Sequence, residues 1–173
     1  MANTYTLIAS NTLSSSAASV TFSSIPNTYT DLVVRCSVRS DYASTGDNIT
    51  LTFNSNSSSI YSNTIVFGNG SSGVSQRNSA GNPGYVAYVV DGDVSTASTF
   101  GSVEIYLPSY TSSTNKPFSS FGARENNATA AVVAANAGLF ASTSAISSIQ
   151  IGLQFGPNFV SGSSFFLYGI KNS

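Results

Sequence analysis

Residues 31–39, DLVVRCSVR, decide the fold class of this chain. Apolar side chains recur at every second position: Leu32, Val34, Cys36 and Val38. The residues between them fall on the opposite side: Val33, Arg35, Ser37 and Arg39. A period of two is typical of a β-strand, because successive side chains point to opposite faces of a sheet. The stretch therefore predicts a strand with one buried face and one face in water.

Alternation of the same kind recurs along the chain. Two clear examples are residues 48–53 and 149–155, where Ile, Leu and Phe alternate with Asn, Thr, Gln or Gly. Further strand candidates are Ser19–Phe22 and residues 4–9, 61–67, 85–90, 100–107, 130–135 and 165–170. Together with residues 31–39 these segments make about ten predicted strands.

The segments between the predicted strands carry turn residues. Asn69-Gly70 and Asp91-Gly92 tolerate a positive φ, so each predicts a tight hairpin turn. Asn82-Pro83-Gly84 predicts a further turn, because Pro fixes one φ and Gly frees the next. Residues 54–59 and 71–81 are rich in Ser and are expected to be surface loops.

The sequence pattern does not decide whether residues 128–141 form a helix or a strand. Their Ala-rich composition favours a helix, whereas Val132 and Val133 and the absence of a capping pattern fit a strand of small residues equally well. No other segment offers a long helical pattern.

Many short strands, polar loops and no long helix predict an all-β fold, specifically an antiparallel β-sandwich of the jelly-roll type. Trp is absent, so the Cys, Trp and Cys signature of an immunoglobulin domain is missing. No internal repeat, Pro-rich linker or charge shift divides the chain. Residues 1–173 are therefore expected to form a single domain.

Charge and histidine are scarce. Of 173 residues, 6 are Lys or Arg and 7 are Asp or Glu, so 8% are charged, where about 25% is usual. This argues against a nucleic-acid partner, because phosphates require several cations. With no His and one Cys, a Ser/His/Asp triad, a Cys/His dyad, a zinc site with His ligands and an internal disulfide are excluded. We expect a structural or binding protein that is not an enzyme and has no cofactor.

The N-terminal sequence, Met1-Ala2-Asn3-Thr4-Tyr5, lacks the basic start and apolar core of a secretory signal. No apolar run approaches the roughly 20 residues that span a bilayer. We therefore expect neither export nor a membrane partner.

Two groups of acidic residues are candidate cation ligands. Asp91 and Asp93 flank a glycine at a spacing that calcium could use, provided that other loops supplied further oxygens. Asp41 and Asp47, with Gly46, form a similar but looser group. Neighbouring acids are too few for a dedicated calcium loop, so the favoured interpretation is an ordinary turn, and we expect no metal.

Glu104 and Glu125 are the candidates for acid/base catalysis by paired carboxylates, and nothing in the sequence places them close together. Glu104 lies between Val103 and Ile105 on the outward phase of its strand. It is expected to lie in water or to meet Arg35 or Arg39 across strands. We therefore expect no catalytic residue.

Cysteine and tyrosine have simpler interpretations. Cys36 shares the phase of Leu32, Val34 and Val38, so we expect a buried, unreactive thiol. The nine tyrosines favour a core or a subunit interface, with a sugar-stacking surface as the alternative; they are Tyr5, Tyr29, Tyr42, Tyr61, Tyr85, Tyr88, Tyr106, Tyr110 and Tyr168. The Asn-x-Ser/Thr sequons, at Asn48, Asn56, Asn69 and Asn127, match the number that chance predicts.

Three longer stretches carry a resemblance to a known group. They are FSSIPNTYTDL at 22–32, LFASTSAISSI at 139–149 and SSFFLYGIK at 163–171, with a further trace at Thr114-Asn115-Lys116. Together they resemble small virion proteins of tailed bacteriophages, which occur as tail or fibre components and as capsid-associated proteins. The resemblance runs from about Tyr5 to Lys171, and the closing motif is its most specific part.

The resemblance implies a virion structural protein. No coiled-coil heptads or collagen-like repeat supply the stem of a fibre, so we expect a capsid decoration, or cement, protein. Such a protein is made in the host cytoplasm and docks on the major capsid protein at the capsid surface, as a homotrimer by analogy. Tyr5 and Leu7 are the candidate contact residues. The alternative is a tail-fibre or surface receptor-binding module that holds host glycans in a shallow site of Tyr, Asn and Ser.

Overall fold

The computed structural model describes residues 4–81, 83–126 and 130–171, and all regular secondary structure in them is β-strand. Twelve strands occur in this part of the chain: β1 (Tyr5–Thr12), β2 (Ser19–Phe22), β3 (Asp31–Val38), β4 (Gly46–Phe53), β5 (Tyr61–Gly68), β6 (Gly73–Gly81), β7 (Gly84–Asp91), β8 (Gly101–Leu107), β9 (Lys116–Glu125), β10 (Ala131–Phe140), β11 (Ile149–Leu153) and β12 (Ser164–Ile170). The predicted all-β fold is confirmed.

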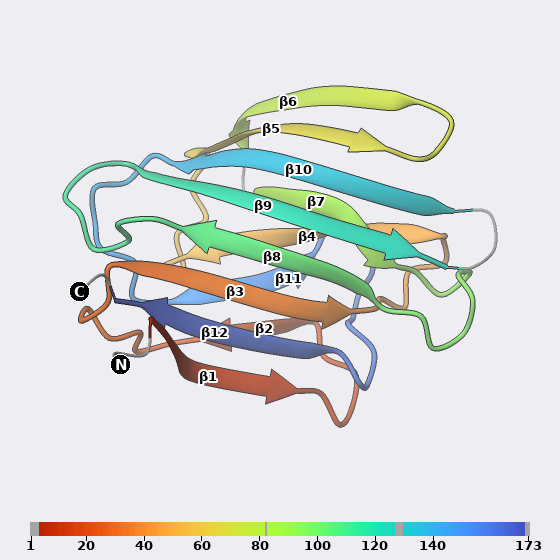
Figure 1. The fold of residues 1–173 in the computed structure, drawn as a ribbon, viewed down its shortest axis with the longest axis horizontal. Coiled ribbons are helices and arrows are strands. Elements are labelled where there is room, and N and C mark those ends of the chain that lie inside the picture. Colours follow the sequence, from red (N-terminus) through yellow and green to blue (C-terminus); the bar gives the residue numbers. More distant parts are fainter. Residues whose placement is uncertain (1–3, 82, 127–129, 172–173) are drawn as a thin grey trace.

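The strands form two antiparallel sheets that pack face to face (Figure 1). The larger sheet has the order β1-β12-β3-β8-β9-β10-β5-β6 and the smaller one β2-β11-β4-β7. The larger sheet lies in front in Figure 1, with the smaller sheet behind it. The molecule is therefore an antiparallel β-sandwich, as predicted.

The path of the chain gives the sandwich its jelly-roll character. From β2 onward the chain alternates between the sheets, entering the smaller sheet at β2, β4, β7 and β11 and the larger sheet in between. The smaller sheet and the series β3-β8-β5-β6 form the two halves of a jelly roll. The β9–β10 hairpin is inserted between β8 and β5, and β12 and β1 extend the sheet beyond β3.

Two strands were missed by the sequence pattern. Residues 71–81 were predicted as a loop, but most of them form β6, an edge strand with few large apolar side chains because only one neighbour covers it. Strand β9 was not predicted because two positions of its buried phase carry Lys116 and Arg124, which breaks the hydrophobic alternation. The ambiguous segment 128–141 is strand β10 where the structure describes it.

The predicted turns have different outcomes. Asn69-Gly70 lies in the β5–β6 hairpin, where the Asn69 side-chain oxygen accepts hydrogen bonds from Ser71 N and Ser72 N, and Gly70 has a φ of +83°. The hairpin predicted at Asp91-Gly92 is wrong, because after β7 the chain crosses to the other sheet. Gly92 instead permits close backbone packing: a Cβ there would lie 2.1 Å from Ser44 O. Asn82, of the third predicted turn, lies outside the described residues.

One hydrophobic core lies between the sheets, and its largest part is an aromatic cluster. Phe53 on β4 contacts Phe118, Phe140 and Tyr61, with ring centroids 5.8, 5.4 and 6.1 Å away. The Tyr61 hydroxyl accepts a hydrogen bond from Phe53 N and donates one to Asn56 O. Gly138 makes room for the cluster, since a Cβ there would lie 2.1 Å from the Phe118 ring. Side chains from both sheets thus interlock at this point.

The smaller sheet covers only part of the larger one. Strand β7, at its edge, packs against β9, β10 and β5, and the β5–β6 hairpin extends beyond it (Figure 1). On the inner side of β5, Tyr61 and Asn63 are buried, whereas Ile65 and Phe67 are only partly buried. The side of this hairpin that faces the smaller sheet is therefore partly exposed to solvent toward the end of β5.

We predict that Phe53→Ala lowers the free energy of unfolding by about 3–5 kcal/mol, because it leaves a cavity among three rings. Urea denaturation measures the loss. Phe121→Ala is the matched control: Phe121 is 59% exposed on the other side of the larger sheet, and its loss should stay below about 1 kcal/mol. Equal losses for the two variants would contradict the central position of Phe53.

Candidate functional site

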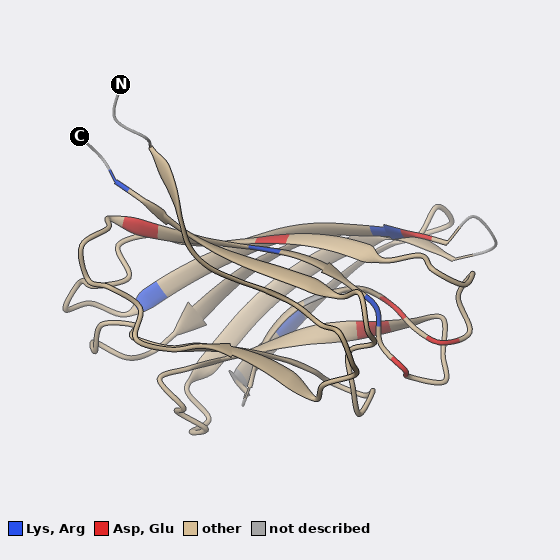
Figure 2. Cartoon of the chain, turned by 90° about the horizontal axis from the view of Figure 1, so that it is seen from below, with Lys and Arg blue, Asp and Glu red and all other residues tan. Residues whose placement is uncertain are grey.

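Nearly half of the 13 charged residues are buried. Six of them are buried: Asp31, Arg39, Asp47, Asp91, Lys116 and Arg124. Charged side chains are almost never buried unless they are paired or hydrogen-bonded. Figure 2 shows how few charged positions remain on the rest of the fold. The chain's small number of charges therefore leaves wide areas of surface neutral.

Arg39 is the clearest case of a buried charge with a structural role. Its guanidinium donates hydrogen bonds to four backbone oxygens, those of Asp93, Ser95, Thr96 and Thr99, at 2.8–3.2 Å. The prediction that Arg39 faces outward, toward water or Glu104, is therefore wrong. The strand pattern ends at Val38, and Arg39 turns inward to organise the loop between β7 and β8.

The acidic pair Asp41 and Asp47 holds the loop that follows β11. Asp47 accepts hydrogen bonds from the backbone N–H groups of Phe155 and Gly156, at 3.1 and 2.7 Å. Asp41 accepts two from Asn158, at 2.9 and 2.8 Å. The oxygens of both carboxylates thus accept hydrogen bonds from residues 155–158 of the chain.

Asp91 and Asp93 do not form a joint cation site in the structure. Asp91 is fully buried and lies 3.5 Å from the Arg124 guanidinium, whereas Asp93 is exposed. No cluster of three or more potential metal ligands occurs within residues 4–81, 83–126 and 130–171. Among the described residues, Asp91 Oδ2 and Arg124 Nε have no hydrogen-bond partner, so the ion pair is incompletely satisfied.

Glu104 and Glu125 are not brought together. Glu104 forms an exposed ion pair with Arg35, directly opposite on β3, at 2.8 Å; of the two predicted partners, Arg35 is the correct one. On the other side Glu104 faces Phe121 of β9, four residues from Glu125. Four residues of strand span about 13 Å, more than the roughly 9.5 Å upper limit for paired carboxylates in glycosidases.

Cys36 is a buried core residue, as predicted. Burial raises the pKa of the Cys36 thiol well above its ordinary value. The thiol therefore stays protonated and unreactive at neutral pH.

The outer face of the larger sheet is the broadest candidate surface. We define it by three cross-strand rows, each running over all eight strands. The first is Leu7, Tyr168, Val33, Tyr106, Ser119, Ala137, Thr64, Arg77; the second Ser10, Phe166, Arg35, Glu104, Phe121, Ala135, Val66, Ser75; the third Thr12, Ser164, Ser37, Ser102, Ala123, Val133, Gly68, Gly73. Only the Arg35–Glu104 pair and Arg77 carry charge in these rows.

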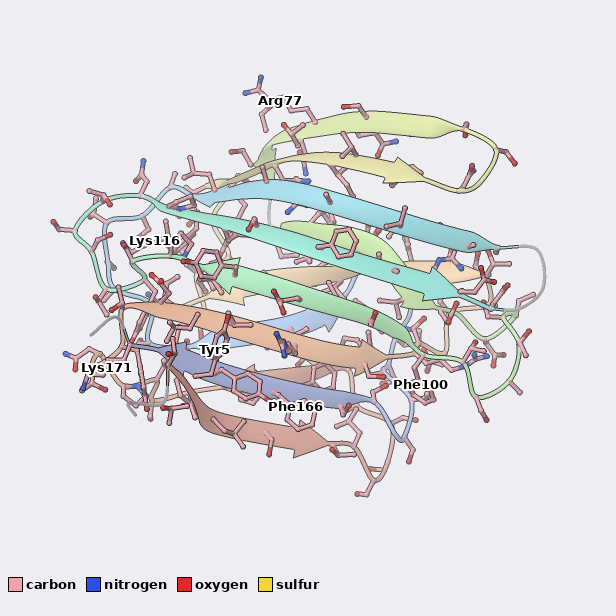
Figure 3. The ribbon with its side chains drawn as sticks, in the orientation of Figure 1. Tyr5, Arg77, Phe100, Lys116, Phe166 and Lys171 are labelled. Atoms are coloured by element: carbon pink, nitrogen blue, oxygen red, sulfur yellow. The ribbon has the colours of Figure 1, made fainter. Side chains whose placement is uncertain are left out.

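Two apolar patches lie on the outer face, one on each side of the ion pair. The first contains the predicted contact residues: Leu7, of the first row, and Tyr5, two residues before it on edge strand β1 and therefore on the same side of the sheet. They are 52% and 51% exposed. Figure 3 shows Tyr5 and Phe166 together over β1 and β12. The second patch is a shallow depression that includes Val66, Phe121 and Val133, all exposed. Both patches expose large apolar side chains on a flat sheet surface.

Tyr106 is fixed in the first row of the outer face by a buried carboxylate. Its hydroxyl donates a hydrogen bond of 2.8 Å to Asp31 Oδ2, while Asp31 Oδ1 accepts one from Ser109 N. The hydrogen bond to the carboxylate raises the pKa of Tyr106, and burial and the negative charge of Asp31 raise it further. Tyr106 and Tyr168 flank Val33, which is almost fully buried although it lies on this side of the sheet.

A second candidate surface is a cleft of about 380 Å³ beside the β5–β6 hairpin, where this hairpin extends beyond β7. Tyr85 and Tyr88 of β7 lie among its lining residues, together with Ile65, Phe67 and Phe155. The other lining residues are Arg77 and five residues with amide side chains: Asn48, Asn63, Gln76, Asn78 and Gln154. The cleft thus combines aromatic rings with neutral hydrogen-bonding groups.

Sequence reasoning did not find this cleft. Its lining comes from β4, β5, β6, β7 and the residues after β11, which are distant in sequence, and β6 was predicted as a loop. The sequence predicts a core or a subunit interface for the tyrosines, with a sugar-stacking surface as the alternative. In the structure they do not share one position. Tyr61 and Tyr110 are in the core, Tyr5 is on the outer face, and Tyr85 and Tyr88 line the cleft.

The described residues include no helix with the length and apolarity that crossing a bilayer requires.

Removal of the Arg124 side chain tests the buried ion pair. We predict that Arg124→Met lowers the free energy of unfolding by about 3–5 kcal/mol, because Asp91 is left charged and buried without its cation. Arg35→Met breaks the exposed pair with Glu104, whose side chains are 55% and 47% exposed, and should cost no more than about 1 kcal/mol. Urea denaturation of both variants makes the comparison, and equal costs would refute a structural role for Asp91.

The raised pKa of Tyr106 predicts a loss of stability in alkali. The folded protein holds this proton more tightly than the unfolded chain, so its stabilisation is complete below the ordinary tyrosine pKa of about 10 and is lost as pH rises through the higher folded value. Urea midpoints between about pH 9 and pH 11 should fall less steeply for Tyr106→Phe than for the wild type. In an Asp31→Asn background the two curves should converge; a persistent difference would point to another cause.

Comparisons of this chain with protein-family models, with curated proteins and with solved structures find no match. The functional conclusions below therefore depend on the outer face and the cleft.

Proposed function

We propose that this chain is a non-enzymatic virion structural protein that docks on a capsid shell through the outer face, as a decoration or cement protein. The observation that carries the proposal is the broad surface that runs across all eight strands of the larger sheet, in which 3 of the 24 positions are charged and two of those three form the Arg35–Glu104 ion pair. The resemblance to small phage virion proteins supplies the expected partner, the major capsid protein. A homotrimeric form is part of the same proposal.

The size of the outer face suits protein docking. Eight strands that each occupy about 4.8 Å and three rows that each occupy about 6.7 Å give a surface of roughly 38 by 20 Å, or about 770 Å². A standard protein interface buries about 800 Å² on each partner. The outer face is therefore large enough to supply most of one such interface.

The composition of the outer face also suits docking. Arg35 and Glu104 already form an ion pair with each other, so covering them leaves neither of these two charges unpaired. The third charged residue, Arg77, lies on edge strand β6, at the border of the outer face. Exposed aromatic residues such as Phe121 and Tyr5 are typical anchors of protein interfaces. Ser, Thr, Ala and Gly fill 13 of the 24 positions in the three rows and permit close approach. Contacts repeated over a shell would make a modest affinity at each site sufficient.

The proposal is tested with particles of the virus that encodes the chain, prepared without this protein. Wild-type protein added back should bind saturably in co-sedimentation and should raise the temperature at which the particles release their genome. Val66→Arg places a charge in the second apolar patch and should weaken binding by at least about tenfold.

Val94→Arg is the control, because Val94 is 65% exposed in the loop between β7 and β8, outside the outer face. It should bind like the wild type. Absence of binding, or equal binding by Val66→Arg, would refute the docking surface. Saturable binding without any change in the release temperature would refute the cement role.

A further inference from the structure

We infer that the cleft beside β7 is a binding site for a neutral saccharide, a function additional to docking through the outer face. The inference depends on three properties of the cleft: rings held in place, a high density of amide groups and an almost uncharged lining.

Two aromatic side chains of the cleft, Tyr88 and Phe155, contact neighbours outside it. The Arg124 guanidinium lies over the Tyr88 ring, 4.8 Å from its centroid. The Phe155 ring stacks on Tyr42 at 5.4 Å and an interplanar angle of 26°. Tyr85 and Tyr88 are partly exposed and Phe155 is exposed. Fixed rings with accessible surface suit the apolar C–H faces of a pyranose and lose little side-chain entropy on binding.

The amide side chains provide the polar half of the site. An amide has both donors and an acceptor, which is the combination that sugar hydroxyls require. Asn48 donates to the Gln154 side-chain oxygen, so these two amides form a pair. Asn63 is buried and donates to Asn136 Oδ1 on the neighbouring strand β10 at 3.1 Å, which fixes its orientation. Two of the five amides are thus positioned by each other and a third by a residue of the neighbouring strand.

The charge of the cleft argues for a neutral, hydroxyl-rich ligand over other classes. Arg77 is the single charged residue in its lining, and Figure 3 shows its side chain projecting from β6 away from the sheets. A phosphorylated ligand normally meets several cations or backbone N–H groups, and a divalent cation requires carboxylates. A purely apolar ligand would leave the amides without partners on desolvation. A saccharide has C–H faces that can pack on the rings and hydroxyl groups that can form hydrogen bonds with the amides.

The volume and position of the cleft agree with this ligand class. A volume of about 380 Å³ lies within the usual 300–1,000 Å³ of small-molecule sites. The cleft lies where the β5–β6 hairpin extends beyond β7, so it is open to solvent along the uncovered hairpin. An open cleft of this kind can accept a terminal sugar of a longer glycan.

Saturation-transfer difference NMR tests the inference. The probes are the methyl glycosides of glucose, galactose, mannose and N-acetylglucosamine, the disaccharides maltose, lactose and chitobiose, and the nucleosides adenosine and uridine. We expect saturation transfer to the ring C–H protons of at least one saccharide. Phe155→Ala and Tyr85→Ala should each weaken the binding of that saccharide by at least tenfold.

Phe121→Ala is the matched control, because it removes an exposed ring from the outer face instead of the cleft; it should bind the saccharide like the wild type. No transfer to any saccharide, transfer to the nucleosides alone, or equal binding by the cleft variants would overturn the inference. Particle binding separates this site from the proposed docking function: Phe155→Ala should still bind particles, and Val66→Arg should still bind the saccharide.

Discussion

The unequal width of the two sheets is the constraint on which the other features of this structure depend. A four-stranded sheet can cover the inner side of only part of an eight-stranded sheet. Where it does so, rings from both sheets interlock around Phe53 and form the core. Where it does not, the inner side of β5 and β6 is left open, and the cleft forms beside β7. The core and the cleft are therefore two results of the same architecture.

The use of charge is the second organising feature. Asp31, Arg39 and Asp47 each bind backbone or hydroxyl groups of a connecting segment. A sandwich with long connections needs such anchors, since buried backbone groups must be hydrogen-bonded. Because these positions consume much of a small supply of charged residues, few remain for the surface. The burial of six of the 13 charged residues thus lowers the charge of the surface further.

Hydrophobic alternation predicted most of the fold, and its failures have physical causes. Strand β3 was predicted well because its inner residues are all apolar. Strand β9 was missed because Lys116 and Arg124 occupy inward positions, where hydrogen bonds and an ion pair compensate for their burial. Two of the stretches that carry the sequence resemblance, residues 22–32 and 163–171, meet in the structure: Tyr29 lies against Gly169, where a Cβ would be 2.3 Å from the Tyr29 ring. The cleft could not be predicted, because it requires five segments and the register between them.

The outer face and the cleft use opposite sides of strand β5, and Arg77, on edge strand β6, is the one residue of the rows that also lines the cleft. On β5, Thr64 and Val66 belong to the outer face, whereas Asn63, Ile65 and Phe67 line the cleft. Side chains that alternate along a strand point to opposite sides of the sheet. A protein docked through the outer face would therefore keep the cleft turned away from the surface beneath it. Many copies fixed on a particle would present the cleft as a repeated site, which would let individually weak sugar contacts combine into firm attachment.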